Sequence, residues 1–100
     1  MTENGDDEEA VPDSVVLPIT GELDLHAFAP RDVPSVVTEY LFACRERGLT
    51  EVRIIHGRGT GTQRAVVRRL LGTLPEVIAF DDAPPISGGW GATLVRLSAK

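Results

Sequence analysis

The chain has 100 residues, of which 42% are hydrophobic, and its formal net charge is −5. This length supports one domain with one core and is too short for two. A single cysteine, Cys44, excludes an internal disulfide and favours a reducing, cytoplasmic setting. No apolar run approaches the roughly 20 residues of a membrane-spanning helix, and the acidic N-terminus is unlike a signal peptide, so we expect no membrane partner.

The negative charge is concentrated in residues 1–14, MTENGDDEEAVPDS, which hold six of the 15 acidic residues and no basic one. The remaining residues hold nine acids and ten bases, a net charge of +1. Low hydrophobicity and like charge predict a disordered acidic tail, 1–14, in front of a single domain, 15–100. The tail is interpreted as a solubilising leader. The alternative is that it imitates a polyanion and competes for a basic site on the domain.

The first predicted elements are two short strands and a helix entry. The apolar segment 15–19 contains Pro18, which limits it to an edge strand. Residues 23–26, LDLH, alternate apolar and polar side chains, the pattern of a half-buried strand. Prolines at both ends of 30–34 mark a helix entry, with Asp32 as the expected N-cap.

One continuous apolar stripe follows on this first helix, and Gly48 is the expected stop after its C-terminus. The stripe recurs at helical spacing and consists of Val33, Val36, Val37, Tyr40, Leu41 and Cys44. Because Cys44 belongs to the stripe, we interpret it as a packing residue.

The second half of the chain continues the alternation of strands and helices. The expected elements are a strand at 51–56, a helix at 62–72, a strand at 77–81, a loop at 84–91 and a final strand at 92–97. Strands that alternate with helices predict parallel crossovers. The predicted fold class is therefore α/β, in the order strand–helix–strand–helix–strand–strand. It is a two-layer sandwich with two helices on one face of a four-stranded, mixed and mainly parallel sheet.

Both histidines of the chain, His26 and His56, are expected to end strands. Ligands of open α/β sheets gather outside the carboxyl ends of the strands, so two neighbouring strands would bring both imidazoles to one rim. Asp24 lies two residues before His26, and its side chain would leave the strand on the same face, where a carboxylate can orient an imidazole. The alternative for either histidine is a hydrogen bond to a nearby loop.

The loop that leads into the second helix reads Gly57-Arg58-Gly59-Thr60-Gly61. Free N–H groups at a helix N-terminus favour an anion, and glycine lets a phosphate approach the backbone. Arg58 can add a bidentate contact. The alternative is a tight strand-to-helix turn without a ligand. The full set of nucleic-acid or phosphate-binding candidates is Gly57, Arg58, Gly59, Gly61, Arg64 and Trp90.

Further polar and aromatic residues extend this picture. Arg64 and Arg68 lie one helical turn apart and either extend a cationic surface or form a solvated helix face. Trp90 either stacks on a nucleobase or caps the core. Asp81 and Asp82 are interpreted as solvated acids at a strand end, and no spacing resembles a zinc site.

Three segments together resemble the Smr domain, the small MutS-related domain, in its stand-alone bacterial form. They are LDLH (23–26), IIHGRGTG (54–61) and GGWGATLVRL (88–97), and the resemblance runs from about Ile19 to Leu97. It implies a fold similar to the C-terminal domain of a bacterial translation initiation factor. It also implies binding of DNA or RNA and, as in many members, endonuclease or nicking activity.

The two histidine motifs carry the implied roles. The family's first motif is usually LDLHG, and Ala27 stands here in the glycine position. The second is commonly HGKG or TGKG, and Arg58 replaces its lysine while keeping the positive charge. By resemblance, Asp24 and His26 are the catalytic candidates, whereas His56, Arg58 and the loop glycines bind phosphate.

The working hypothesis is phosphodiester cleavage, with His26 as general base or acid, oriented by Asp24, and His56 as its candidate catalytic partner. No metal is required if an RNA 2′-hydroxyl attacks. If water attacks, a divalent ion such as magnesium or manganese on Asp24 is the expected cofactor. A non-catalytic nucleic-acid-binding module and a site for a small phosphorylated ligand are the alternatives, and a domain charge near +1 favours the former. The sequence is compatible with a monomer.

Overall fold

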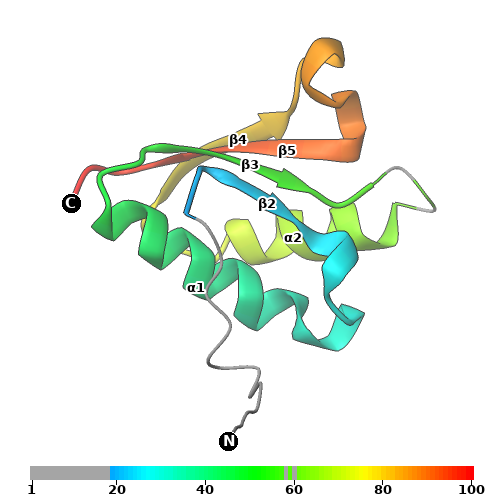
Figure 1. Cartoon of the computed structure of the whole chain (residues 1–100), viewed down its shortest axis with the longest axis horizontal. Helices are drawn as coiled ribbons and strands as arrows, with labels where there is room; N and C mark the ends of the chain where they lie inside the picture. The colour runs from blue at the N-terminus through cyan, green and yellow to red at the C-terminus, as the bar shows by residue number, and fades with distance from the viewer. Residues whose placement is uncertain (1–18, 58, 60) are drawn as a thin grey trace, which may run out of the picture.

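The structure, a computed structural model, describes residues 19–57, 59 and 61–100. The acidic tail, the segment 15–18, Arg58 and Thr60 lie outside the described residues. The strands are β2 (Glu22–Asp24), β3 (Glu51–Ile55), β4 (Val77–Asp82) and β5 (Ala92–Leu97), and the helices are α1 (Val33–Glu46) and α2 (Thr62–Leu71) (Figure 1). The short 3₁₀ turns are η2 (Leu25–Ala27), η3 (Pro30–Asp32), η4 (Pro85–Ser87) and η5 (Gly89–Gly91).

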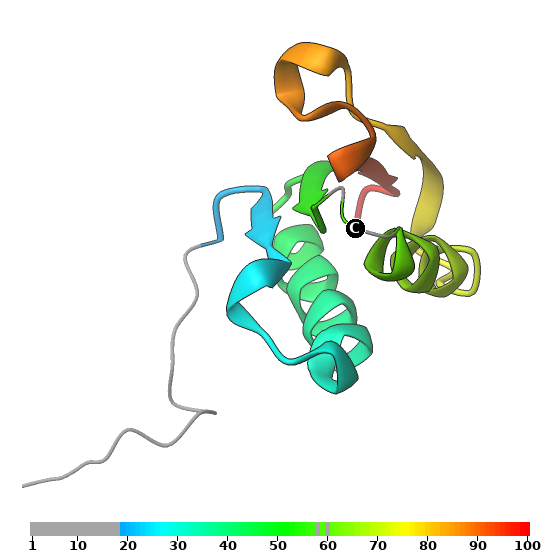
Figure 2. The same ribbon diagram turned by 90° about the vertical axis from the view of Figure 1, so that its right-hand side faces the viewer.

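The four strands form one sheet in the order β2-β3-β5-β4, and both helices pack against the same face of it (Figures 1 and 2). The predicted α/β sandwich is therefore confirmed, but a mainly parallel sheet is wrong. The β2–β3 pair is parallel, whereas β3–β5 and β4–β5 are antiparallel. The two helical crossovers do make β2, β3 and β4 run in one direction. The mixed pairing arises because β5 turns back after β4 and inserts between β3 and β4.

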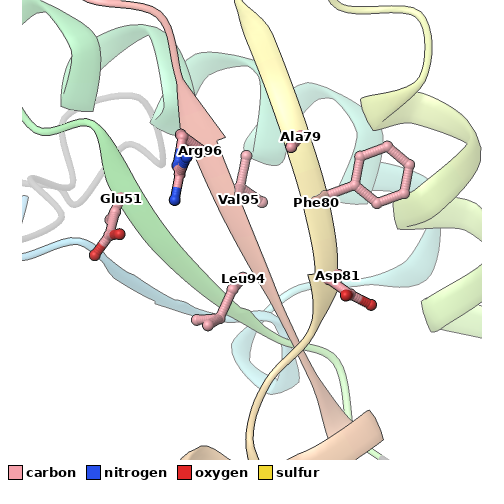
Figure 3. Close-up of a pocket in the computed structure, with 7 residues that line it drawn as sticks. All are labelled: Glu51, Ala79, Phe80, Asp81, Leu94, Val95 and Arg96. Atoms are coloured by element: carbon pink, nitrogen blue, oxygen red, sulfur yellow. The ribbon is translucent and has the colours of Figure 1, made fainter.

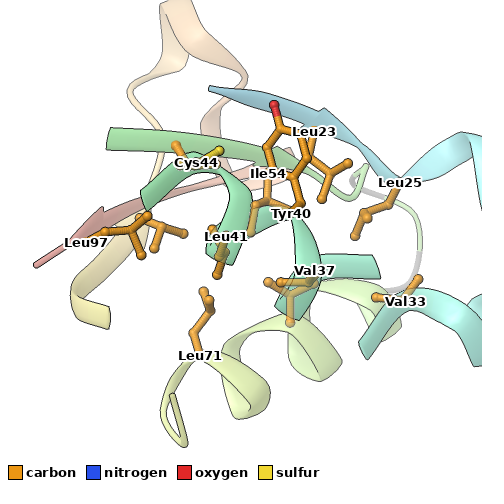
Figure 4. Packing of buried hydrophobic residues seen from close by; sticks show 13 residues of the cluster. Leu23, Leu25, Val33, Val37, Tyr40, Leu41, Cys44, Ile54, Leu71 and Leu97 are labelled. Carbon is orange, nitrogen blue, oxygen red and sulfur yellow. The ribbon is translucent and has the colours of Figure 1, made fainter. Parts of the chain in front are cut away.

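The core lies between this sheet and the two helices (Figure 4). Five stripe residues of α1 are at most 3% exposed, namely Val33, Val37, Tyr40, Leu41 and Cys44. Val36 is partly buried at the edge of this core, and α2 adds Val67 and Leu71. Burial raises the pKa of the Cys44 thiol, so the interpretation of this residue as core packing is confirmed.

The opposite face of the sheet carries no helix within the described residues and is largely polar. A shallow depression of about 350 Å³ lies on it, lined by Glu51, Ala79, Phe80, Asp81, Leu94, Val95 and Arg96 (Figure 3). Leu94 is 38% exposed there. None of the site residues proposed from the sequence lines this depression.

Tyr40 attaches the short edge strand β2 to α1. Its buried hydroxyl accepts hydrogen bonds from the backbone N–H groups of Gly21 and Glu22, at 3.2 and 3.1 Å, and donates to the Glu22 carbonyl at 2.9 Å. Because β2 has three residues, these bonds hold much of the strand that ends at Asp24. The first catalytic candidate is thus positioned from the core.

We expect Tyr40→Phe to lower the free energy of unfolding by about 1–3 kcal/mol, because it leaves three partly buried backbone groups without their partner. Urea unfolding followed by circular dichroism measures this change. Phe42→Leu is the control, since Phe42 lies on the same helix but is 59% exposed, and we expect it to change stability by no more than about 0.5 kcal/mol. Equal stability of Tyr40→Phe and wild type would show that the bonds contribute nothing.

Candidate functional site

The carboxyl ends of β2 and β3 meet at one rim of the sheet, on the right in Figure 1 and towards the viewer in Figure 2. The two strands are parallel neighbours, and Asp24 is in register with Ile55. The segments that carry His26 and His56 therefore leave the sheet side by side. This arrangement is the shared rim that the sequence predicted for the two histidines.

Asp24 and His26 form a hydrogen-bonded pair, but the predicted strand through His26 is wrong. The strand ends at Asp24, because the carboxylate Oδ1 caps η2 by accepting from the backbone N–H of His26 at 2.9 Å. The same oxygen contacts His26 Nδ1 at 2.6 Å. The backbone bond, and then the side-chain bond, hold the pKa of the Asp24 carboxyl below its usual value. A carboxylate can only accept, so Nδ1 carries a proton and Nε2 is the atom that can act on a ligand.

Gly57 lies directly against this imidazole. A Cβ atom at Gly57 would be 3.0 Å from Nε2 of His26, and the glycine has φ of +82°. Both the backbone conformation and the space for the ring therefore require glycine here. The contact joins the two sequence motifs at a single point.

His56 is buried beneath the rim, with 7% of its surface exposed. Its Nδ1 lies 3.1 Å from the Gly57 carbonyl, which can only accept, so Nδ1 carries the proton. Its Nε2 lies 2.8 Å from the Thr93 hydroxyl and, in the neutral ring, accepts from it. Burial is the main cause that lowers the pKa of His56. The ring thus favours its neutral form and has both nitrogens engaged.

The start of α2 and the loop between β4 and β5 border the other side of the rim. Gly61, with φ of +82°, is the N-cap of α2 and has no side chain with which to cap the first turn. The ring of Trp90, 43% exposed, lies 3.9 Å from the position of a Cβ on Gly61. The Arg64 guanidinium carbon is 6.0 Å from the centre of that ring. Gly59 is exposed between these elements.

Arg64 and Arg68 share a carboxylate at the end of β4. Asp82 Oδ1 accepts from Arg64 at 2.7 and 3.1 Å and from Arg68 at 3.4 Å. Arg68 also lies 5.1 Å above the ring of Phe80. Asp82 is exposed, as interpreted from the sequence, and it is in addition ion-paired with both arginines. Partly exposed pairs of this kind contribute about 1 kcal/mol or less, so Arg64 can exchange Asp82 for another anion at little cost.

Two residues of the rim were missed by the sequence reasoning. Thr93 is fully buried under His56, and the Gly91 carbonyl accepts from the N–H groups of His56 and Gly57 at 3.1 and 2.9 Å. Thr93 did carry a signal, since it is a polar side chain at an inward position of the final strand. Gly91 acts through its backbone and carried none.

The described residues include neither a cluster of metal-binding side chains nor a helix suited to a membrane. No three His, Cys, Asp or Glu side chains gather there as a metal-binding group. No described helix has the length and apolar composition to cross a membrane.

Comparison with known proteins identifies a family. A family model described as Smr domain matches residues 23–98. The crystal structure of the Smr domain of Thermus thermophilus MutS2 superposes with a TM-score of 0.75 and 37% identity, covering 79% of this chain and 99% of that one. The crystal structure of YdaL, a stand-alone small MutS-related protein from Escherichia coli, superposes with a TM-score of 0.75 and 30% sequence identity. This match covers 83% of this chain and 67% of that one. The fold is thus shared over most of the chain.

The curated relatives are much longer proteins. Endonuclease MutS2 from Thermus thermophilus is 38% identical over 76 residues, and that from Carboxydothermus hydrogenoformans is 40% identical over 76 residues. Each match covers 76% of this chain but 10% of the relative. The chain therefore corresponds to about a tenth of the MutS2 proteins that it matches.

The lowered pKa of His56 predicts that stability falls with acid. The His56 imidazole binds a proton more tightly in the unfolded chain than in the folded one. Its contribution to the free energy of unfolding is therefore fully present above about pH 6.5 and is lost as the pH falls below that value. We expect the melting temperature to drop by a few degrees between about pH 7.5 and pH 5.5, and to drop less in His56→Gln, which cannot titrate. His26→Ala, which leaves His56 intact, is the histidine control and should retain the drop. An equal drop in His56→Gln would contradict the assignment.

A pair of glycine variants tests the contact between the two motifs. Gly57 and Gly48 have φ of +82° and +80°, but a Cβ on Gly48 would meet nothing within 4 Å. We expect both alanine variants to lose about 1–2 kcal/mol of stability through the strained backbone. Only Gly57→Ala should displace the His26 ring, which the imidazole nitrogen chemical shifts in NMR spectra would report. Unchanged His26 shifts in Gly57→Ala would refute the contact.

Proposed function

The chain belongs to the Smr domain family, and on that basis we propose that it binds DNA or RNA at the rim and cleaves the phosphodiester backbone as an endonuclease. The MutS2 relatives carry the name endonuclease, but they are about ten times longer than the matched part. The activity is therefore argued from the rim itself. The observation that carries the proposal is the Asp24–His26 pair, whose Nε2 faces the glycine-rich loop.

Phosphate binding is assigned to the loop from Gly57 to Gly61 and to the start of α2. Glycine leaves the backbone accessible, and the N-terminal dipole of a helix favours negative charge. Arg64 can turn from Asp82 to a phosphate oxygen, because the two anions compete for the same guanidinium. Arg58, in the middle of this loop, is proposed as a further phosphate ligand. Trp90 is proposed to stack on a base beside it.

Proton transfer is assigned to His26. Asp24 holds the protonated Nδ1, so Nε2 takes the proton of the attacking hydroxyl as the new P–O bond forms. The same nitrogen can return this proton to the leaving oxygen when the old P–O bond breaks. The loop N–H groups stabilise the charge that builds on the phosphate oxygens.

His56 is assigned a positioning role within this proposal, in place of the proton-transfer partnership considered from the sequence. It is buried, its pKa is lowered, and both ring nitrogens already have partners. A proton could reach a substrate from His56 only after one of these hydrogen bonds broke. Its bond to the Gly57 carbonyl instead fixes the turn on which His26 rests.

Two chemical routes are compatible with these assignments. An RNA 2′-hydroxyl could attack with no metal, which would leave a cyclic phosphate and a free 5′-hydroxyl. Water could attack with the help of a divalent ion, since magnesium commonly binds one carboxylate together with water and substrate phosphate. Asp24 is the carboxylate of the rim that would serve it.

One observation favours a second candidate function, a binding module without turnover. The two arginines at the start of α2 are partly neutralised by Asp82, so the described rim lacks the strongly basic surface of many nucleic-acid binders. Affinity would then come from one local phosphate site. Binding without cleavage by the wild-type protein would identify this class.

We expect His26→Ala and Asp24→Asn to lower the cleavage rate of labelled DNA or RNA by about a hundredfold or more, as loss of a positioned acid–base group does. Affinity should change by no more than about threefold, because neither residue supplies the main phosphate contacts. Asp81→Asn, an exposed aspartate of β4 on the helix-free face of the sheet, is the control and should cleave at the wild-type rate.

The same cleavage assay distinguishes attack by an RNA 2′-hydroxyl from attack by water, and it can refute the proposal. Loss of cleavage with a single 2′-deoxy nucleotide at the scissile position indicates attack by the RNA hydroxyl, whereas loss with EDTA indicates a metal-assisted water. Full activity of His26→Ala would refute the assignment of proton transfer. The absence of nucleic-acid binding by the wild-type protein would refute the whole proposal.

A further inference from the structure

The loop between β4 and β5 presents two apolar side chains to solvent. Ile86 in η4 is 96% exposed and Trp90 in η5 is 43% exposed. A single exposed apolar residue is common on protein surfaces. Here, however, the two lie four residues apart, in successive 3₁₀ turns of one protruding loop at the rim end of the sheet (Figures 1 and 2).

Covalent and hydrogen-bonded restraints hold this loop in one shape. Pro84 and Pro85 fix two backbone angles before the tip, and the N–H of Ser87 donates to the Pro84 carbonyl at 2.8 Å. Arg53, on the helix-free face of the sheet, donates to the Ser87 carbonyl at 2.7 Å and is itself ion-paired with Glu22. A loop braced in this way loses little conformational entropy when it contacts a ligand.

The loop is continuous with the proposed phosphate site. The Gly91 carbonyl accepts the N–H groups of His56 and Gly57, and the Trp90 ring lies beside Gly61 and Arg64. The η4 tip extends from η5 away from the rim (Figure 2). A strand with a phosphate at the glycine-rich loop would therefore meet Trp90 first and the tip beyond it.

We propose that Ile86 and Trp90 form an apolar edge that contacts successive bases, so that the rim prefers single-stranded nucleic acid with accessible base faces. This inference rests on the proposed function. Trp90 stacks on the base next to the bound phosphate, which tolerates any sequence because every base has a flat face. Ile86 covers the following base. In a paired duplex both faces of each base are already stacked, and reaching them requires unpairing.

The size of the edge argues against a protein partner. Beside Ile86 the tip exposes Pro84 and Pro85, followed by serine and glycine, so its apolar surface is a small patch of a few side chains. Protein interfaces need a much larger contiguous patch, of at least about 1,000 Å² in total. A narrow, rigid apolar edge beside an anion site fits the alternation of phosphate and base along a single strand.

Ile86→Ser tests the inference with a matched control. Ile78→Ser replaces another exposed isoleucine, 61% exposed, at the opposite end of β4 from the loop. Fluorescence anisotropy would measure the affinity of each variant for a labelled single strand of about a dozen nucleotides, a length within common site sizes, and for the same strand paired with its complement. Trp90→Ala, with the exposed Phe42→Ala as control, is measured in parallel.

We expect Ile86→Ser to weaken single-strand binding about three- to tenfold, because it removes one buried apolar contact. Duplex binding and the salt dependence should stay unchanged, because no phosphate contact is lost. Ile78→Ser should bind both ligands as the wild type does. Because Ile86 is almost fully exposed, its replacement should leave folding intact.

Other outcomes overturn the inference. Wild-type binding by Ile86→Ser would exclude a role for the tip, and an equal loss on single strand and duplex would exclude the preference for accessible bases. Either result would leave the proposed function standing, because the wild-type protein would still bind nucleic acid. Failure of the wild-type protein to bind either ligand would overturn both proposals.

Discussion

The rim depends on the absence of a side chain at Gly57. Three segments that are distant in the sequence meet on this residue. The His26 ring lies 3.0 Å from the position that a Cβ on Gly57 would take, the His56 ring contacts the Gly57 carbonyl, and the Gly91 carbonyl accepts the Gly57 N–H. The left-handed backbone is the conformation that presents all three surfaces at once. One residue thereby couples the end of β2, the end of β3 and the entry into β5.

Two aspartates at the rim form hydrogen-bonded pairs with different partners. Asp24 faces His26 and fixes which ring nitrogen carries a proton. Asp82 faces Arg64 and Arg68 and offsets their charge while no other anion is present. In the proposed function, the first carboxylate prepares an acid–base group, and the second holds Arg64 until a phosphate replaces that carboxylate. The proposed anion site therefore depends on how readily Arg64 leaves Asp82.

Local patterns in the sequence predicted the parts of the fold that local forces determine. The apolar stripe of α1 and the C-terminal stop at Gly48 follow from helical periodicity and glycine chemistry. The insertion of β5 was not predictable, because strand pairing joins residues far apart in the chain. The shared rim was predicted, but not the burial of His56, since its partner Thr93 lies 37 residues away. The alternation of apolar and polar residues predicted a strand that reaches His26. The strand ends at Asp24, because the Asp24 side chain caps the 3₁₀ turn that follows.

The insertion of β5 also fixes the order in which the sheet can be completed during synthesis. This strand occupies an interior position between β3 and β4, although it is the last of the four to be made. Before it emerges from the ribosome, β3 and β4 have no common neighbour, and the helices have only part of a surface to cover. Much of the sheet therefore forms through contacts of long sequence separation, which folding reaches slowly. We infer that the domain folds as one cooperative unit after β5 is available, rather than strand by strand.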